Sequence, residues 1–212
     1  MLVGLYGGTF DPVHLGHIHA ALAAQEVLGL PQVRMVLAAR PGHRSAPAGS
    51  SLHRWRMLCL ACEAHPVLVP DDSELRRDGH SYTIDTVIAA RGVEQQCVPC
   101  WILGQDAFAT LPSWHQWQRL LDYCNLIVVH RPNDIRPEPA PVQALCRVHG
   151  VDLLDPNCVG QIVRLDVPMR AVSSTMVRAQ VAAGEMPSDL LAAPVSAYIK
   201  AHGLYANTEQ VV

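Results

Sequence analysis

A glycine-rich stretch near the start of the chain has the residue types and spacing expected of an anion site. It follows a short apolar run, residues 1–6, and reads Gly7-Gly8-Thr9-Phe10-Asp11-Pro12-Val13-His14-Leu15-Gly16-His17. Two glycines let the backbone approach a ligand closely. A helix predicted to begin near Leu15 would turn free N–H groups and a positive dipole end toward an anion. His14 and His17, three positions apart, add donors on one face, and Gly16 is expected to keep the surface between them open. The stretch predicts a polyphosphate site; the alternative is an ordinary turn with two surface histidines.

A second polar stretch lies near the other end of the chain, at residues 172–178 (VSSTMVR). Ser173, Ser174 and Thr175 are good N-cap residues and predict a helix over 172–183. Arg178 lies one turn further and can reach an anion held at the same helix start. The alternative is an ordinary capped helix.

Apolar runs alternate with helix-like stretches along the chain. The predicted strands are 1–6, 33–38, 67–69, 99–103, 126–130 and 161–167, and the predicted helices are 15–28, 52–63, 83–90, 172–183 and 195–202. Residues 40–51 and 70–82 are expected to be loops, and 131–142, with four prolines, a surface connection. The alternation predicts an α/β fold: a Rossmann-like, doubly wound parallel sheet with helices on both faces and a small C-terminal helical part. Ligands of such sheets bind at the carboxyl ends of strands.

Composition excludes several classes of protein. The chain has 212 residues, half of them hydrophobic, and a formal net charge of -3. It has no excess of Lys and Arg to bind nucleic acid or an anionic membrane. It also has no apolar run long enough for a transmembrane helix and no secretory signal, so we expect a cytoplasmic protein. Composition leaves open whether it forms a homo-oligomer.

Seven cysteines are an odd number, unlike a secreted disulfide framework. Two Cys-x2-Cys pairs, Cys59/Cys62 and Cys97/Cys100, could suggest structural zinc. They fall in helix-like and strand-like apolar runs, however, so we expect buried free thiols and no dedicated metal site in the protein.

The two polar stretches together resemble the signatures of the H-x-G-H nucleotidyltransferase superfamily, GGTFDPVHLGH at one end and S-[ST]-T-x-[IV]-R at the other. Three further stretches are similar to bacterial nicotinate mononucleotide adenylyltransferases: residues 81–86 (SYTIDT), 102–106 (ILGQD) and 111–117 (LPSWHQW). The ending Leu204-Tyr205 is similar too. The resemblance covers residues 2–205 and implies a single nucleotidyltransferase domain over 1–205, followed by a polar tail, 206–212.

The resemblance implies transfer of AMP from ATP to nicotinate mononucleotide in NAD biosynthesis, with Mg²⁺, giving nicotinate adenine dinucleotide and pyrophosphate. The attacking phosphate is already an anion, so positioning and charge stabilisation can supply the catalysis. The implied catalytic residues are His14, His17 and Arg178. The implied ATP-binding residues are these three with Gly7, Gly8, Thr9, Phe10, Gly104, Asp106, Arg131, Ser173, Ser174 and Thr175. The implied mononucleotide-binding residues are Arg40, His43, Arg44, Thr83, Trp114 and His115.

Within these sets, the resemblance gives single residues particular roles. Gly104 would admit the nucleoside, and Asp106 would accept hydrogen bonds from ribose hydroxyls. Trp114 would stack on the pyridine, while Thr83 and the His115 backbone would hold its carboxylate. The N–H groups of a helix start expected near Trp114 would help there.

One stretch departs from the resemblance. The second strand of the family typically ends in Pro-Asn-Asn, whereas residues 37–41 read LAARP, so Arg40 is expected to donate in place of the missing amide. The alternatives are nicotinamide mononucleotide or phosphopantetheine as the adenylyl acceptor, and a nucleotide-binding regulatory module without catalysis.

Overall fold

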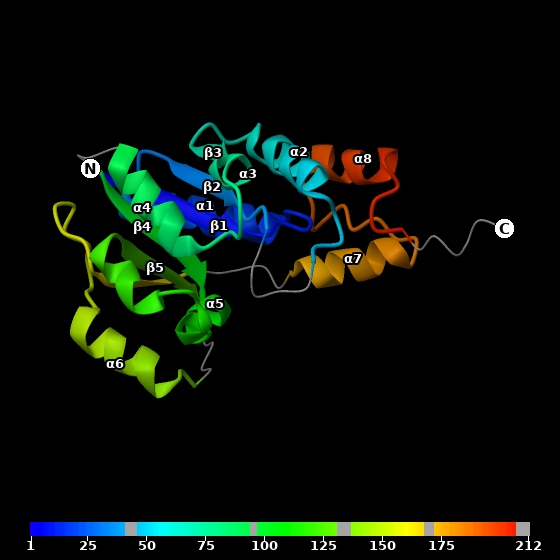
Figure 1. Ribbon diagram of the computed structural model, residues 1–212. Helices are drawn as coiled ribbons and strands as arrows, with labels where there is room; N and C mark the ends of the chain where they lie inside the picture. The colour runs from blue at the N-terminus through cyan, green and yellow to red at the C-terminus, as the bar shows by residue number, and fades with distance from the viewer. Residues whose placement is uncertain (41–45, 94–96, 131–136, 168–171, 207–212) are drawn as a thin grey trace.

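Parallel strands form the centre of the protein (Figure 1). The computed structural model describes residues 1–40, 46–93, 97–130, 137–167 and 172–206. Within these ranges one sheet has six strands in the order β3-β2-β1-β4-β5-β6, and each neighbouring pair is parallel. The strands are β1 (Leu2–Gly8), β2 (Val33–Leu37), β3 (Leu68–Asp71), β4 (Val98–Gly104), β5 (Asn125–His130) and β6 (Ile162–Asp166). The order reverses between β1 and β4, so their carboxyl ends define the switch point at which such folds bind ligands.

Helices cover both faces of this sheet, as the sequence predicts. One face packs against α1 (Leu15–Leu28) and α2 (Ser51–Cys62), and α7 (Ser174–Ala182) and α8 (Ala193–Ala201) extend the same hydrophobic core. The other packs against α4 (Thr83–Val93), α5 (Gln105–Ala109), α6 (Ala140–His149) and two 3-10 helices, Leu111–Ser113 and Trp117–Asp122. The short helix α3 (Ser73–Arg76) follows β3. The Rossmann-like doubly wound fold is therefore confirmed.

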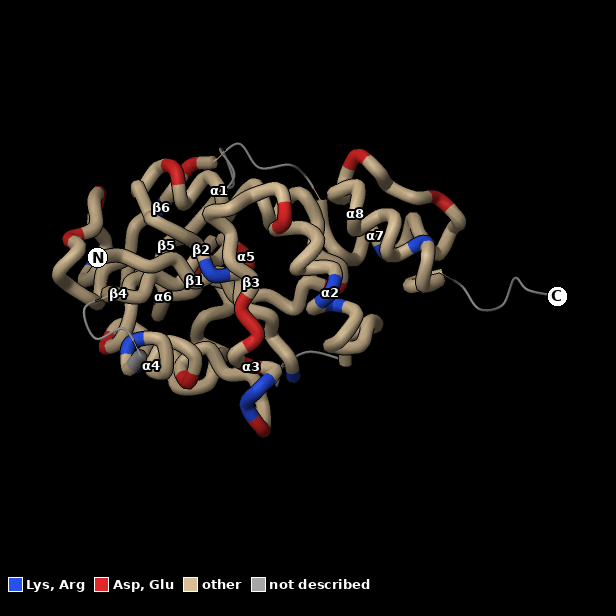
Figure 2. Tube along the Cα trace, turned by 90° about the horizontal axis from the view of Figure 1, so that it is seen from above, with Lys and Arg blue, Asp and Glu red and all other residues tan. Residues whose placement is uncertain are grey.

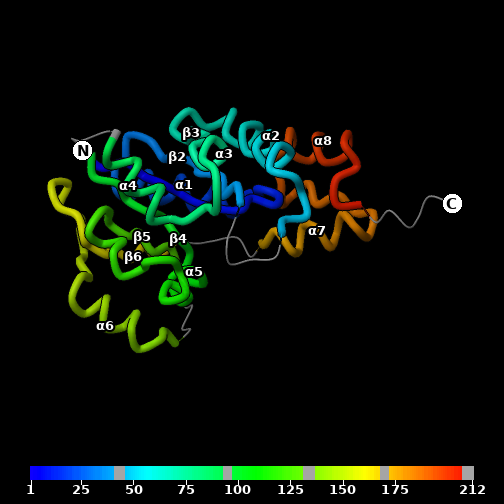
Figure 3. The backbone as a smooth tube through the Cα atoms, viewed as in Figure 1, coloured from blue at the N-terminus to red at the C-terminus, as the bar shows by residue number. Residues whose placement is uncertain are grey.

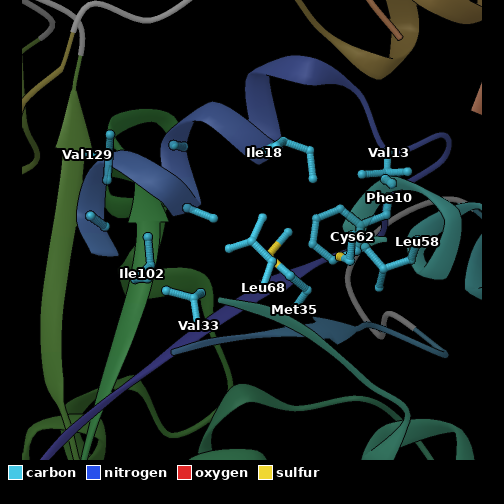
Figure 4. Close-up of a cluster of buried hydrophobic side chains, with 14 of the residues drawn as sticks. Phe10, Val13, Ile18, Val33, Met35, Leu58, Cys62, Leu68, Ile102 and Val129 are labelled. Atoms are coloured by element: carbon cyan, nitrogen blue, oxygen red, sulfur yellow. The ribbon is translucent and has the colours of Figure 1, made fainter. Parts of the chain in front are cut away.

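Alternation along the strands separates two hydrophobic cores. Met35 belongs to the core under α1 and α2, whereas its neighbour Val36 belongs to the core under α4. Figure 4 shows the first core, in which Phe10 and Val13 lie near Leu58 of α2. Phe10 and Val13 come from the glycine-rich stretch, so the buried core anchors the turn between β1 and α1.

The C-terminal helices lie at the opposite end of the molecule from α6 (Figure 3). Helix α8 packs against α2, where Nδ1 of His53 lies 3.0 Å from the hydroxyl of Tyr198. The expected small C-terminal helical part is therefore folded back onto the first half of the chain. Residues 207–212 of the expected polar tail lie outside the described ranges.

Some expected loops contain regular structure. Helix α6 begins at Ala140, inside the expected surface connection, because its prolines occupy the N-cap and first turn, where proline is tolerated. Strand β3 continues through Pro70, which an edge strand accepts, and α3 follows in the expected loop 70–82.

Acidic and basic residues are interspersed along the chain trace (Figure 2). Within the described ranges, every helix is too short or too polar to cross a lipid bilayer.

Candidate active site

The turn between β1 and α1 starts at the switch point and is built around buried side chains. Phe10 has a positive φ of 47° and a ring only 1% exposed. A Cβ on Gly7 would lie 2.2 Å from the Trp101 ring, and one on Gly8 would lie 2.7 Å from the Phe10 ring. The missing side chains of these glycines thus make room for the protein's own aromatic rings. Close approach of a ligand to their backbone stays a prediction.

His14 and His17 lie together at the start of α1, as predicted, and their rings stack. Their ring centroids are 3.7 Å apart and the planes are inclined by 20°. The backbone N–H of His14 donates to Nδ1 of His17 over 3.2 Å, so His17 carries its proton on Nε2. Nδ1 of His14 is buried and has no hydrogen-bond partner within the described chain.

Burial sets the charge of this pair. It lowers the pKa of His14 to about 4. Burial also holds the pKa of His17 well below its ordinary value, with a further contribution from His14. Both imidazoles are consequently neutral near pH 7, and each can donate one N–H to a ligand.

The backbone at the start of α1 offers fewer free donors than expected. The Leu15 N–H donates to the carbonyl of Leu190 over 2.9 Å, and the His17 N–H donates to the carbonyl of His14 over 2.9 Å. The expectation of free N–H groups at this helix start is therefore wrong for these two residues.

The two signature stretches meet in space. The Ser174 hydroxyl donates to the Pro12 carbonyl over 2.9 Å, and Nη1 of Arg178 donates to the Asp11 carbonyl over 2.6 Å. Val172 lies against Gly16, because a Cβ there would be 2.6 Å from the Val172 Cγ1 atom. Gly16 thus makes room for Val172, and the expectation that it keeps the surface between the histidines open stays a prediction.

The hydroxyls of the second stretch are already engaged. Ser173 caps α7 by accepting from the Met176 N–H over 3.2 Å, and the Thr175 hydroxyl lies 3.4 Å from Nη2 of Arg178. These two bonds lie within the start of α7 itself, and Thr175 is exposed.

Arg54 is a site-supporting residue that sequence reasoning missed. Its side chain is only 1% exposed, and its guanidinium donates to the carbonyls of Thr9, Ala38, Ala39 and Gly49 at 2.8–3.1 Å. It therefore joins the segments that follow β1 and β2. The signal was available, because Arg54 falls on the same helical face as the apolar residues Met57, Leu58 and Ala61.

Arg40 joins the end of β2 to the segment before α4. Nη1 of Arg40 donates to the Arg77 carbonyl over 2.8 Å, and its backbone N–H donates to the Ser81 hydroxyl over 3.1 Å. In return, the Ser81 N–H donates to the Arg40 carbonyl over 2.9 Å. Arg40 is thereby held next to the segment that leads into Thr83, the first residue of α4.

Trp114 and His115 approach the same region on the face of the sheet that α4 covers. The ring of Tyr82 stacks on His115 with centroids 4.3 Å apart, and Trp114 is half-buried against the second core. Trp114 ends a 3-10 turn, its N–H donating to the Leu111 carbonyl over 2.9 Å, and the next helix begins only at Trp117. The helix start expected near Trp114 is therefore wrong.

Gly104 ends β4 beside β1 and is the N-cap of α5. A Cβ there would meet no atom within 4 Å, so the space above it is open within the described chain. Asp106 is exposed in the first turn of α5. The expected site residues His43, Arg44 and Arg131 lie outside the described ranges.

Comparison with known proteins places this site in a family. The cytidylyltransferase-like family model matches residues 5–180. A relative from Aeromonas salmonicida, named "probable nicotinate-nucleotide adenylyltransferase", is 42% identical over 206 residues, which cover 96% of each chain. A relative with the same name from Pseudomonas fluorescens is 40% identical over 210 residues, again 96% of each. The chain belongs to the nicotinate-nucleotide adenylyltransferase family.

Solved structures agree with this family's fold. The Plasmodium falciparum nicotinic acid mononucleotide adenylyltransferase complexed with NaAD superposes with a TM-score of 0.74. It covers 96% of this chain and 97% of its own at 15% sequence identity. At 15% identity this likeness shows the fold alone. The shared fold extends over nearly the whole of both chains.

Proposed function

We propose that this chain transfers AMP from ATP to nicotinate mononucleotide, giving nicotinate adenine dinucleotide and pyrophosphate in NAD biosynthesis. The proposal is carried by one observation: the stacked pair His14 and His17 and the start of α7 meet at the switch point of the sheet. The relatives at 40–42% identity over 96% of the chain carry the corresponding name.

The proposed reaction requires hydrogen-bond donors to the phosphates more than it requires a general base. A phosphate oxygen of the mononucleotide bonds to the α-phosphorus of ATP, and the bond from that phosphorus to the oxygen bridging to the β-phosphate breaks, releasing pyrophosphate. Because the nucleophile is already anionic, the barrier lies in alignment and in charge repulsion. In the proposal, Nε2–H of His17 donates to the α-phosphate, while His14 and Arg178 stabilise the phosphates.

The proposal divides the candidate site between two substrates. ATP lies along the β1–α1 turn (Gly7, Gly8, Thr9, Phe10), the end of β4 (Gly104, Asp106) and the start of α7 (Ser173, Ser174, Thr175), with Arg131. The mononucleotide lies toward Arg40, Thr83, Trp114 and His115, with His43 and Arg44. Its pyridine ring stacks on Trp114.

In this proposal, Mg²⁺ binds to the site together with ATP. The Asp11 carboxylate at the turn already accepts hydrogen bonds from two amides and a phenol, so it is not placed to hold a metal. The residues around Asp11 are mainly hydrogen-bond donors and not metal ligands. This suits an Mg²⁺ ion that binds mainly phosphate oxygens and water. When bound, the ion neutralises phosphate charge.

A cytoplasmic setting is also part of the proposal. All seven cysteines are free thiols, the state that a reducing compartment maintains.

The direct test is product identification. Purified protein with ATP, Mg²⁺ and nicotinate mononucleotide is expected to form nicotinate adenine dinucleotide and pyrophosphate in equal amounts, measured by mass spectrometry and a pyrophosphate assay. Reactions without mononucleotide are the control. Formation of neither product by a folded chain that binds ATP would overturn the proposal and favour a regulatory nucleotide-binding module.

A further inference from the structure

The Asp11 carboxylate is a junction of segments that are far apart in the sequence. It is only 5% exposed. Its Oδ1 atom accepts from the Tyr205 hydroxyl over 2.7 Å and from the Gly49 N–H over 2.9 Å, and its Oδ2 atom accepts from the Ala48 N–H over 2.8 Å. The last turn of the described chain is thereby tied to the turn that leads into His14.

The same residue holds Arg178. The Asp11 carbonyl accepts from Nη1 of Arg178 over 2.6 Å, and that nitrogen lies 3.8 Å from Oδ2 of the Asp11 carboxylate. A shift of Asp11 would therefore move the guanidinium that faces the β1–α1 turn. Because the guanidinium donor is charged, its hydrogen bond to the Asp11 carbonyl is stronger than one between two neutral groups.

Tyr205 is held in place with some strain. Its φ is 64°, in the left-handed region that non-glycine residues seldom occupy. Gly49 makes room for it, because a Cβ at that position would lie 2.8 Å from the Tyr205 hydroxyl. Burial, together with the Asp11 carboxylate, raises the pKa of Tyr205, so the phenol stays protonated and donates.

We propose that Tyr205 is a positioning residue of the nucleotide site: by donating to Asp11, it fixes the place of the Arg178 guanidinium and thereby strengthens ATP binding. This inference rests on the proposed function only in taking ATP as the ligand of the site. Tyr205 itself touches no substrate in this arrangement and acts through Asp11.

The test compares two variants that each lose one phenolic hydroxyl. Tyr205→Phe removes the donor to Asp11. Tyr198→Phe, the control, removes a hydroxyl on α8 that lies 3.0 Å from Nδ1 of His53. We expect the dissociation constant for ATP with Mg²⁺, measured by calorimetry, to rise about three- to tenfold in Tyr205→Phe and to stay within about twofold in the control.

A double variant separates positioning from general stability. In an Arg178→Lys background, Tyr205→Phe should weaken ATP binding by less than about twofold further, because the group that it positions is already gone. An equal factor in both backgrounds would overturn the inference, as would a lower melting temperature with unchanged ATP affinity, or a wild-type chain that does not bind ATP. The proposed function fails separately if the wild-type chain binds ATP normally but forms no dinucleotide.

Discussion

The His14 and His17 side chains are neutral hydrogen-bond donors in the ligand-free protein near pH 7. Burial lowers both pKa values, so neither imidazole is cationic near pH 7. A polyphosphate placed against them would favour the protonated form of each ring, so ATP binding at mildly acidic pH should be coupled to proton uptake. The positive charge on the imidazoles would then lie beside the negatively charged phosphates and stabilise them.

The buried pair should make stability depend on pH. In the unfolded chain His14 titrates near pH 6.5, and in the folded chain near pH 4. Between these values the unfolded state binds the extra proton, so acidification favours unfolding by up to about 1.4 kcal/mol per pH unit. Urea unfolding at pH 7, 6 and 5 should show a shallower loss for His14→Asn than for the wild-type chain. Parallel curves would show that His14 is not buried in its neutral form.

His17 is predicted to contribute to turnover far more than to stability. His17→Ala removes a donor aimed at the α-phosphate, so kcat should fall by roughly 10²–10⁴-fold while the fold survives. His19→Ala, on the same helix, is the control and should retain kcat. Steady-state kinetics with circular dichroism on both variants checks this. A folded His17→Ala protein with near wild-type kcat would remove His17 from the mechanism.

At the scale of elements, local signals were enough to predict the strands and the longer helices α1, α2, α4, α7 and α8, but not α3, α5 and α6 or the contacts between elements. Residues 15–28 match α1 because Gly29 supplies the left-handed C-cap, with φ 60°, where the apolar pattern ends. The sequence does not predict helix α6, because prolines at its start are also typical of loops. Side-chain contacts such as those of Arg54 with four carbonyls, or Tyr205 with Asp11, depend on tertiary packing that no local pattern encodes.

The glycine positions show the same limit within the site. The sequence places Gly7, Gly8 and Gly16 in a polyphosphate-binding motif, yet their nearest neighbours are Trp101, Phe10 and Val172. The sequence could therefore predict which two motifs belong together, and these motifs do meet in the fold. It could not predict that close packing of the protein's own side chains requires these glycines.

The contact of Gly16 with Val172 predicts a coupled pair of substitutions. Gly16→Ala should destabilise the protein by about 1–3 kcal/mol, because the new Cβ would lie 2.6 Å from Val172 Cγ1. Val172→Ala should recover part of this loss in the double variant. Gly92→Ala is the control: it lies in α4 with open space around its Cβ, so it should be neutral or stabilising. Additive effects in urea unfolding would contradict contact between α1 and the segment before α7.

At the scale of the whole molecule, the sheet order places two candidate subsites side by side. The ends of β1 and β4 flank the switch point, and Arg54 links the segments that follow β1 and β2. Arg40, Thr83 and His115 gather around the end of β2 and the start of α4. The architecture thus suits a reaction that joins two nucleotides end to end.

The most direct measurement compares kcat/KM for nicotinate mononucleotide and nicotinamide mononucleotide, with ATP and Mg²⁺ in excess. Donors that match a carboxylate are left mismatched by an amide, at a cost on the order of 1–3 kcal/mol or more. We predict a preference for the nicotinate substrate of at least about tenfold. Equal kcat/KM values for the two substrates, or a preference for the amide, would contradict the assignment of nicotinate mononucleotide as the adenylyl acceptor.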